Sequence, residues 1–314
     1  MRAASVIASQ LDAQSNEWLR QQLPGHQVLD LAPEQLSAEN ADVMILCPIN
    51  VRGRRVDTPP PGWPGSLAWV QLMSSGIDFY PDWLFQGPPV SSAKGSNAEQ
   101  VAEFALAAIF SAAKRMPDIW VKDADWQFSS LQPVRGRTLG ILGLGSIGRS
   151  LANKATALGM RVIGLGRPGQ SLSGLAQIEE AHDLHQLFAL SDHLVLAAPL
   201  TSQTRGMINR QVLASAKPGL HLINIARGGL LDQQDLLEAL EYGWLDRATL
   251  DVTEPEPLPA GHPLYRHPKV FISPHTCAAS TEGTRSFTDD FVDNFSRYRQ
   301  GLPLRNLVDY QRGY

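Results

Sequence analysis

Residues 143–148 read Gly-Leu-Gly-Ser-Ile-Gly, and this segment constrains the fold more than any other part of the chain. An apolar run at 139–142 precedes it, and a stretch with helical periodicity follows. A strand, a G-x-G-x-x-G turn and a helix in that order are typical of dinucleotide-binding α/β folds. Gly143 would permit the tight turn, Gly145 would let the backbone approach a pyrophosphate, and Gly148 would let the helix pack closely on its strand.

The helix that follows the turn would complete the phosphate site. Its positive end attracts anions, so Ser146 and Ile147 at its start are candidate cofactor contacts beside the glycines. Glycines also mark ordinary turns, which is the alternative interpretation. A second strand-like run at 161–165 arrives where a βαβ unit places its next strand, and this favours the dinucleotide site.

The loop after that second run predicts which dinucleotide is bound. NAD-selective sites usually carry Asp or Glu about 20 residues beyond the glycines, where it binds the adenosine ribose. Here Gly166 stands in place of the acid, with Arg167 and Pro168 next to it. A guanidinium can pair with a 2′-phosphate, so we expect NADP(H) to be preferred, with NAD(H) possible. A solvated loop arginine is the alternative for Arg167.

Composition excludes several other classes of protein. With 314 residues, 43% of them hydrophobic and 18% charged, the chain is long enough for two ordinary globular domains. A net charge of -4 gives no reason to expect nucleic-acid binding. No apolar stretch has membrane-spanning length and the N-terminal apolar patch is too short for a secretory signal, so we expect no membrane association and a cytoplasmic location. Cys47 and Cys277 cannot build a disulfide framework or a zinc cluster, and no metal site is expected.

The first hundred residues alternate strand-like and helix-like runs, which indicates a small parallel α/β domain. A helix is expected at 11–23, and a long helix from Ser96 or Asn97, where Ser96 and Glu99 have capping-box spacing. The expected strands are 5–8, 27–31, 42–46, 68–72 and 89–92.

The rest of the chain predicts a six-stranded doubly wound sheet. Its strands are expected at 139–144, 161–165, 193–198, 220–225, 248–251 and 269–273, with helices such as 232–242, ended by Gly243. The last helix, 281–298, carries Phe287, Phe291 and Phe295 on one side.

The fold class is therefore α/β, with two doubly wound parallel-sheet domains: a Rossmann cofactor domain and a smaller flavodoxin-like substrate domain. We expect the substrate domain to be discontinuous, 1–98 with 283–314, the dinucleotide-binding domain to be 99–282, and a catalytic cleft between them. The aromatic segment 115–132, with Trp120, Trp126 and Phe128, predicts an oligomer contact, although core packing explains it nearly as well.

Three segments at predicted strand ends could do chemistry, because open α/β sheets bind ligands at the carboxyl ends of their strands. Arg227 is followed by two glycines, Glu256 lies between two prolines, and His275 belongs to Ser-Pro-His-Thr. A guanidinium binds a carboxylate and an adjacent carbonyl oxygen, while a carboxylate that orients an imidazole lets the imidazole exchange a proton. Taken singly, Arg227 could bridge loops, Glu256 could be solvated and His275 could be a satisfied strand-end residue.

With these motifs the chain resembles the D-isomer-specific 2-hydroxyacid dehydrogenase family over nearly its full length. The matching pieces are SGID (75–78), SAKGSNAEQVAE (92–103), 143–148, PLTSQTRGMI (199–208), INIARGGLLD (223–232), LDVTEPEPLP (250–259) and SPHT (273–276). The last three carry the family's Arg, Glu and His, which fall on Arg227, Glu256 and His275. Leu165-Gly166-Arg167 and DVTEPEPLP further resemble the NADPH-using glyoxylate/hydroxypyruvate reductase branch.

The resemblance implies further contacts. The backbone amides of Ser75 and Gly76 would bind the substrate carboxylate beside Arg227, and His275 would also contact the substrate. Asp251 would hold the nicotinamide carboxamide, and three residues would border the cofactor: Pro199, Thr204 and Ala226. Two positions depart from the family: Cys277 replaces a small residue and could be oxidisable or simply packed, and Lys94 replaces a proline.

The expected function is reduction of a small 2-oxo acid, of the glyoxylate or hydroxypyruvate type, to the D-2-hydroxy acid by hydride transfer from NADPH, in a homodimer. A dinucleotide-sensing, corepressor-like regulator on the same fold is one alternative. Others are a phosphite- or formate-type dehydrogenase and an enzyme for aromatic 2-oxo acids such as phenylpyruvate. The substrate side-chain pocket, for which Met73, Ser74, Trp126 and Phe128 are candidates, stays open.

Overall fold

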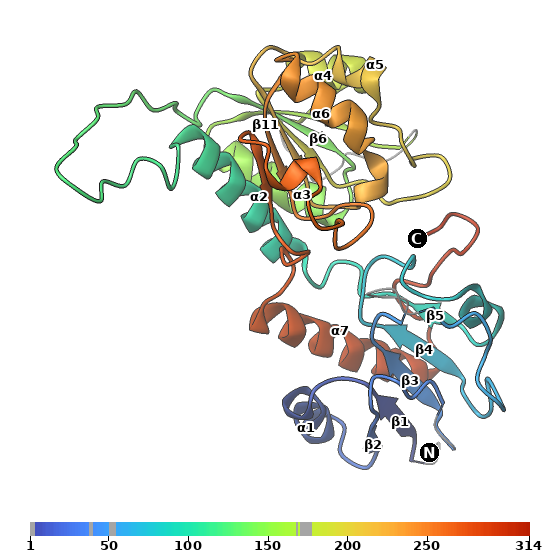
Figure 1. Ribbon diagram of the computed structural model, residues 1–314. Helices are drawn as coiled ribbons and strands as arrows, with labels where there is room; N and C mark the ends of the chain where they lie inside the picture. Colours follow the sequence, from blue (N-terminus) through green and yellow to red (C-terminus); the bar gives the residue numbers. More distant parts are fainter. Residues whose placement is uncertain (1–3, 38–39, 50–54, 168, 170–177) are drawn as a thin grey trace. The chain divides into compact units, whose positions relative to one another are not determined.

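A computed structural model describes residues 4–37, 40–49, 55–167, 169 and 178–314. Pro168 of the predicted adenosine-phosphate loop lies outside these residues. The chain forms two compact units, which we call unit 1 (Met1–Asn97 with Ser280–Tyr314) and unit 2 (Ala98–Ala279) (Figure 1). Among the helices described, none is both long enough and apolar enough to cross a membrane.

Unit 1 is built on five parallel strands in the order β2-β1-β3-β4-β5, the strand order of flavodoxin-like folds. The strands are β1 (Val6–Ser9), β2 (Gln27–Asp30), β3 (Val43–Leu46), β4 (Trp69–Leu72) and β5 (Val90–Ser91). The helices are α1 (Ala13–Gln22), the 3-10 helix η1 (Asp82–Gln86) and α7 (Thr281–Gln300). The central strands β3 and β4 are buried on both faces, as is typical of parallel sheets.

Helix α7 returns the chain to unit 1 and covers one face of its sheet. Phe287, Phe291 and Phe295 are at most 3% exposed, as their spacing of four residues predicts. The Phe291 ring stacks on Trp69 of β4 with centroids 5.3 Å apart. Gly301, at φ 70°, ends the helix in the left-handed conformation that glycine adopts without penalty.

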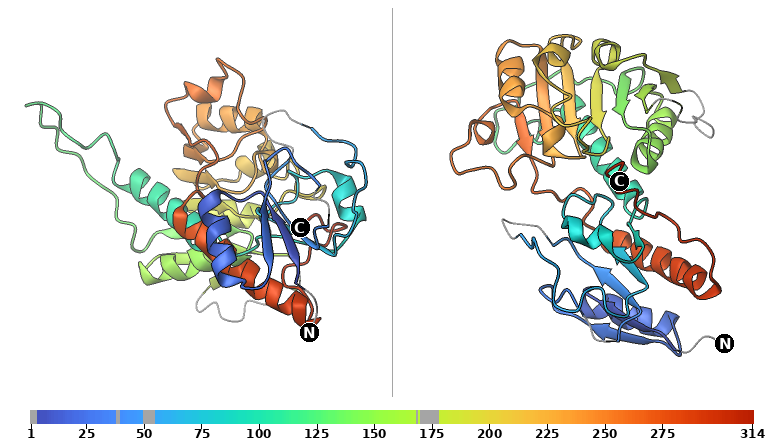
Figure 2. Two further views of the ribbon diagram at one scale, coloured as in Figure 1. Left: turned by 90° about the horizontal axis from the view of Figure 1, so that it is seen from below. Right: turned by 90° about the vertical axis from the view of Figure 1, so that its right-hand side faces the viewer.

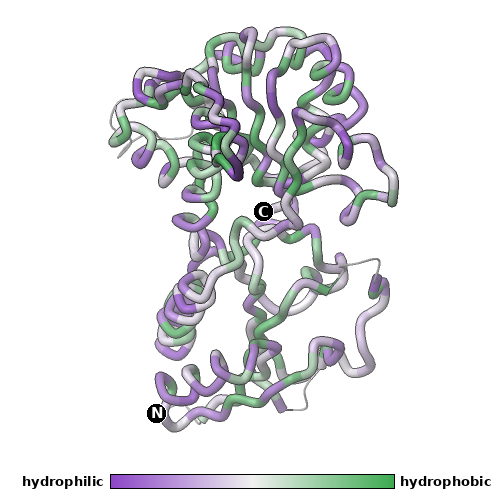
Figure 3. The backbone as a smooth tube through the Cα atoms, turned by 60° about the vertical axis from the view of Figure 1, so that its left-hand side comes forward, coloured by the Kyte–Doolittle hydropathy of each residue, from purple (hydrophilic) through white to green (hydrophobic). Residues whose placement is uncertain are grey.

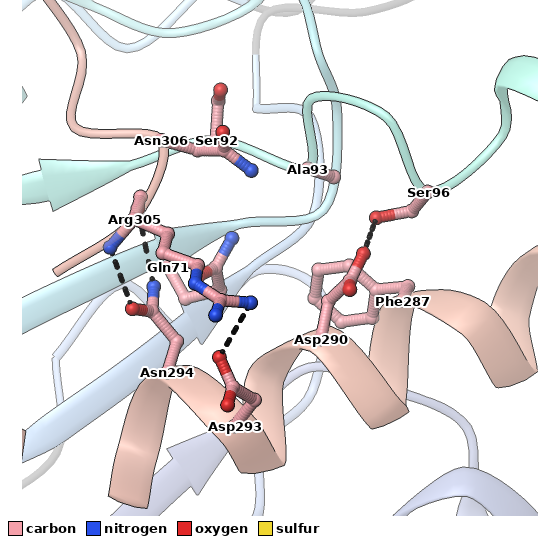
Figure 4. A pocket seen from close by; sticks show the side chains of 10 residues that line it. All are labelled: Gln71, Ser92, Ala93, Ser96, Phe287, Asp290, Asp293, Asn294, Arg305 and Asn306. Carbon is pink, nitrogen blue, oxygen red and sulfur yellow. Dashed lines mark hydrogen bonds and ion pairs between the residues drawn. The ribbon is translucent and has the colours of Figure 1, made fainter. Parts of the chain in front are cut away.

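Polar side chains surround a small cavity of about 30 Å³ between α7, the end of β4 and the chain after β5 (Figure 4). Ser96 donates to the Asp290 carboxylate at 2.7 Å, and Arg305 pairs with Asp293 at 3.0 Å. The capping box predicted for Ser96 and Glu99 is therefore wrong: the Ser96 hydroxyl binds α7, and Glu99 pairs with Lys154 at 2.8 Å. The long helix α2 (Ala98–Ala113) begins just after this contact.

Unit 2 contains a parallel sheet of seven strands, in the order β12-β11-β10-β9-β6-β7-β8. The strands are β6 (Thr138–Leu142), β7 (Arg161–Leu165), β8 (Ile178–Glu180), β9 (His193–Leu196), β10 (Leu220–Asn224), β11 (Leu245–Leu250) and β12 (Val270–Ile272). The order reverses between β6 and β9, which is the switch point of a Rossmann sheet. The prediction of six strands missed β8, because this three-residue edge strand carries two glutamates instead of an apolar run.

Helices cover both faces of the seven-stranded sheet (Figure 2). On one face α2 and α3 (Ser146–Ala157) pack on alternate strand residues such as Ile141 and Val195. The other face receives α4 (Leu184–Leu190), α5 (Arg210–Leu213) and α6 (Gln233–Glu241), which pack on residues such as Leu142 and Leu196. Two 3-10 helices, η2 (Gly228–Leu230) and η3 (Pro263–Tyr265), complete the unit. The strands of the sheet are hydrophobic along most of their length, whereas hydrophobic and hydrophilic residues alternate along the helices (Figure 3).

The aromatic segment after α2 forms an extended loop that projects from unit 2, drawn in green in Figure 1. Trp120, Trp126 and Phe128 are 61%, 81% and 101% exposed. Core packing, one of the two interpretations of this segment, is therefore wrong for these three side chains.

Candidate active site

The glycine-rich turn lies between β6 and α3, at the switch point of the sheet. Gly143 has φ 100°, and a Cβ there would come within 2.7 Å of the Ala197 backbone. A Cβ on Gly148 would overlap the Gly143 carbonyl oxygen, so both positions require glycine. In contrast, a Cβ on Gly145 would meet no atom of the described chain within 4 Å. Gly145 therefore borders open space of the kind a pyrophosphate needs to approach the backbone.

The start of α3 suits an anion. Ser146 is its first residue and Ile147 its second, and among the described residues no side chain caps this helix end. Its amide groups thus face the turn without a side-chain acceptor. The residues present here fit the phosphates of a dinucleotide.

Three more predicted cofactor contacts lie in the loops that follow the two neighbouring strands, β7 and β9. Arg167 is exposed two residues beyond the end of β7. On the other side, the loop after β9 carries Pro199 and Thr204, whose hydroxyl donates to the Pro199 carbonyl at 2.7 Å. Both strands are parallel to β6, so these residues lie at the same edge of the sheet as the glycine turn.

Arg227 follows β10, and the last residue of that strand, Asn224, holds its backbone in place. Buried Asn224 donates through Nδ2 to the Arg227 carbonyl at 2.9 Å and accepts from the Ala226 amide at 3.1 Å. The guanidinium Nη1 donates to the Ala226 carbonyl at 2.7 Å. A Cβ on Gly228 would overlap the Thr253 carbonyl group, so the Arg227 turn packs backbone to backbone on the turn after β11. Sequence reasoning missed Asn224; its signal is a polar residue at the end of an apolar strand.

Glu256 and His275 form a hydrogen-bonded pair. His275 Nδ1 lies 2.8 Å from Glu256 Oε2, and Glu256 Oε1 accepts from the Thr253 amide at 3.1 Å. The His275 side chain is 33% exposed and the Glu256 side chain 34%. A carboxylate at Nδ1 favours the tautomer with its proton there, so Nε2 becomes the nitrogen that can exchange a proton with a substrate.

Asp251 stabilises the turn that carries His275 through three hydrogen bonds. This residue is 1% exposed, and its carboxylate accepts from the Ser273 hydroxyl at 2.6 Å and from the amides of Thr276 and Cys277 at 2.9 and 3.1 Å. His275 itself has φ 51°, an uncommon conformation for a residue other than glycine. Such local strain persists only where surrounding contacts impose it, and it clusters at functional sites.

Cys277 is partly buried and packs against the hydrophobic cluster beneath α2 and α3. Burial and the neighbouring Asp251 carboxylate raise its pKa well above the ordinary value, while the Arg227 charge acts in the opposite direction. A thiol with a raised pKa stays protonated at neutral pH and is a poor nucleophile. Of the two interpretations of Cys277, the geometry favours the packed side chain.

Taken together, the three predicted catalytic residues lie at the carboxyl edge of three neighbouring strands. Arg227 follows β10, Glu256 follows β11 and His275 follows β12. Direct contacts join the Arg227 turn to the Glu256 turn, and Glu256 to His275. The sequence motifs thus correspond to one connected set of groups.

Ser75 and Gly76 belong to unit 1 and follow β4 at its carboxyl end. The Ser75 hydroxyl donates to the Ala93 carbonyl at 3.1 Å, and Ser74 donates to the Gly76 carbonyl at 2.6 Å. These bonds shape the loop without using either backbone amide. Lys94 is exposed, and its carbonyl accepts from Asn306 at 2.9 Å.

A doubly wound sheet with a glycine turn at its switch point, and an arginine, a histidine and a carboxylate along the same edge, defines a dinucleotide-dependent dehydrogenase. Residues 106–277 match the family model "D-isomer specific 2-hydroxyacid dehydrogenase, NAD binding domain". The chain belongs to this family, whose members are NAD(P)-dependent oxidoreductases.

Relatives and solved structures agree with this assignment. Glyoxylate/hydroxypyruvate reductase A of Serratia proteamaculans is 33% identical over 80% of this chain and 82% of its own length. D-3-phosphoglycerate dehydrogenase of Bacillus subtilis is also 33% identical, over 71% of this chain, but the match spans only 43% of that longer protein. A D-isomer specific 2-hydroxyacid dehydrogenase of Xanthobacter autotrophicus Py2, solved in complex with NADPH and MES, superposes with a TM-score of 0.81 at 26% identity and covers all of both chains.

Proposed function

We propose that this protein reduces glyoxylate, hydroxypyruvate or a 2-oxo acid of similar size to the D-2-hydroxy acid, with NADPH as the reductant. The observation that carries the proposal is the 2.8 Å pair of His275 with Glu256 at the sheet edge where Arg227 also lies. The name of the Serratia proteamaculans relative supports the substrate class.

Each catalytic group has a distinct task in this reaction. When bound, the nicotinamide supplies the hydride that reduces the substrate carbonyl. Arg227 binds the substrate carboxylate and stabilises the negative charge that grows on the carbonyl oxygen. His275 donates its Nε2 proton to that oxygen, and Glu256 stabilises the imidazolium and keeps its ring in place.

The proposed cofactor contacts come from the glycine turn and from other loops at the same edge of the sheet. Gly143, Gly145 and Gly148 would shape the phosphate site with Ser146 and Ile147. Pro199, Thr204 and Ala226 would border the cofactor, and Asp251 would bond its carboxamide. Arg167 would pair with the 2′-phosphate of NADPH. The NADPH complex of the Xanthobacter autotrophicus relative supports this preference.

One screen tests the function directly. Purified protein is assayed with glyoxylate, hydroxypyruvate, 3-phosphohydroxypyruvate and phenylpyruvate, each with NADPH and with NADH. We expect the highest kcat/KM with one of the two small substrates and NADPH. Preference for the phosphorylated or the aromatic acid would overturn the substrate assignment. Absence of turnover with every acid, with dinucleotide binding intact, would indicate a regulatory protein instead.

We also propose that the exposed segment 115–132 joins two copies of the chain in a homodimer. Its large aromatic side chains are too exposed for a monomer surface and are of the kind enriched at interfaces. Replacing Trp126 and Phe128 together by Asp should convert the protein from dimer to monomer in light scattering. A wild-type monomer would contradict this proposal.

A further inference from the structure

The Gln233 side chain holds both backbone polar groups of Glu254, in the turn that carries Glu256. Its Nε2 donates to the Glu254 carbonyl at 2.6 Å, and its Oε1 accepts from the Glu254 amide at 3.2 Å. A single carboxamide therefore satisfies both backbone groups of one residue, as a neighbouring strand would.

The helix end that presents Gln233 is itself well fixed. Gln233 is the first residue of α6, and Asp232 caps the helix by accepting from the amides of Gln234 and Asp235 at 2.9 and 3.0 Å. Because the cap and the helix hold the Gln233 backbone, the two bonds to Glu254 connect a rigid element to the turn.

The side chain of Glu254 is bound by an arginine of a different loop. Arg205 Nη1 lies 2.8 Å from each carboxylate oxygen of Glu254. A Cβ on Gly229 would overlap the Glu254 carboxylate and approach Arg205 within 2.9 Å, so this ion pair lies directly against the glycines that follow Arg227. Both side chains are about half exposed, and an exposed pair of this kind is worth little. The ion pair restrains only the Glu254 side chain, whereas the carboxamide of Gln233 bonds to the backbone of the turn itself.

The turn transmits this restraint to the catalytic pair. Thr253 donates its hydroxyl to the Pro255 carbonyl at 2.9 Å and its amide to Glu256 Oε1 at 3.1 Å. The other oxygen of Glu256 is the one bound by His275 Nδ1. A displacement of the Glu254 peptide would therefore move the Glu256 carboxylate relative to the imidazole.

We propose that Gln233 is a positioning residue for acid–base catalysis: it holds the Thr253–Glu256 turn so that Glu256 keeps its bond to His275. The proposal rests on the proposed function for its kinetic consequence, since proton donation by His275 depends on this bond. Among the described residues, both hydrogen bonds of the Gln233 side chain go to Glu254, and neither goes to His275 or to a predicted substrate contact.

Two variants and a matched control test the proposal. Gln233→Ala removes both bonds, and the isosteric Gln233→Glu keeps the side-chain volume but loses the donor to the Glu254 carbonyl. The control is Gln234→Ala, the next residue of the same helix, whose side chain is exposed. We expect both Gln233 variants to lose about tenfold in kcat, the size of one or two hydrogen bonds, with KM unchanged. The alkaline limb of their kcat profile should move to lower pH, because a displaced carboxylate stabilises the imidazolium less.

A second measurement does not depend on turnover. In protein with ¹⁵N-labelled histidine, the Nδ1 proton of His275 is identified by its absence in His275→Gln. We expect this signal to shift or broaden in both Gln233 variants and to stay unchanged in Gln234→Ala. An unchanged signal and pH profile in the Gln233 variants would overturn the positioning role, as would an equal response in the control. If the wild type reduces no 2-oxo acid, the proposed function fails, and the His275 signal alone decides the role of Gln233.

Discussion

At the amino edge of the seven-stranded sheet, His193 opens β9 and His221 lies beside it on β10; at the carboxyl edge, His275 follows β12. His193 and His221 are 8% and 3% exposed, and their Nδ1 atoms lie 3.2 Å apart. Since His221 Nε2 also bonds to Thr249 Oγ1 at 2.9 Å, the pair fits two neutral rings, one donating to the other. His275 instead has a carboxylate partner and is one-third exposed.

The difference shows how one residue type is used for structure or for chemistry. Burial lowers the pKa of His193 to about 4, and burial together with the His193 and Arg247 charges lowers the pKa of His221 well below its ordinary value. Such rings stay neutral at physiological pH and cannot supply a proton. A partly exposed imidazole bonded to a carboxylate can hold and release one.

The largest expected effect is on His275. His275→Ala should lower kcat by about 10²–10⁴-fold, the usual value of general acid–base help, while NADPH binding persists. Steady-state kinetics and cofactor titration by fluorescence measure the two effects. The exposed His182 serves as control, and His182→Ala should leave kcat unchanged. Near-normal turnover in His275→Ala would remove it as the acid.

The buried pair of His193 and His221 should make the free energy of unfolding depend on pH. Because the folded-state pKa of His193 is lowered from 6.5 to about 4, the unfolded chain binds more protons below pH 6.5. The contribution of His193 to the free energy of unfolding is therefore complete above pH 6.5. It falls by about 3 kcal/mol as the pH drops to 4. Urea unfolding of the wild type and of His193→Gln between pH 7 and 4 measures this loss. A slope as steep in the variant as in the wild type would contradict it.

Arg227 should separate substrate binding from cofactor binding. Arg227→Gln should raise KM for the 2-oxo acid by about 10- to 100-fold, the range for a charged hydrogen bond, and change NADPH affinity much less. Arg137, at the amino edge beside Asp192, is the matched control, and Arg137→Gln should leave both values unchanged. A larger NADPH defect than substrate defect in Arg227→Gln would refute the assignment.

The smallest effect is expected at Arg167. Arg167→Ala should lower kcat/KM with NADPH by about tenfold and leave NADH kinetics unchanged, because only NADPH carries the 2′-phosphate that the guanidinium pairs with. The NADH assay is its internal control. Equal losses with both cofactors would show that Arg167 has no part in selectivity.

Much of the fold could be predicted because its signals are local. Apolar runs and the glycine turn predict two parallel α/β sheets, and this class is confirmed. The seventh strand, β8, was missed because it carries two glutamates. Ser96 has the spacing of a capping-box residue, but its hydroxyl donates to Asp290, 194 residues away in the chain. These errors arise where a residue's environment comes from distant parts of the sequence.

The sequence by itself determined which residue types follow which strands: Arg227, Glu256 and His275 at ends that a parallel sheet places at one edge. Only the tertiary structure decided the 2.8 Å pair, the left-handed backbone of His275 and the restraint of that turn by Asp251. It also decided that His193 and His221 are buried against each other. Distances between side chains of different strands depend on register and on packed neighbours, and neither is encoded within the few residues of a motif.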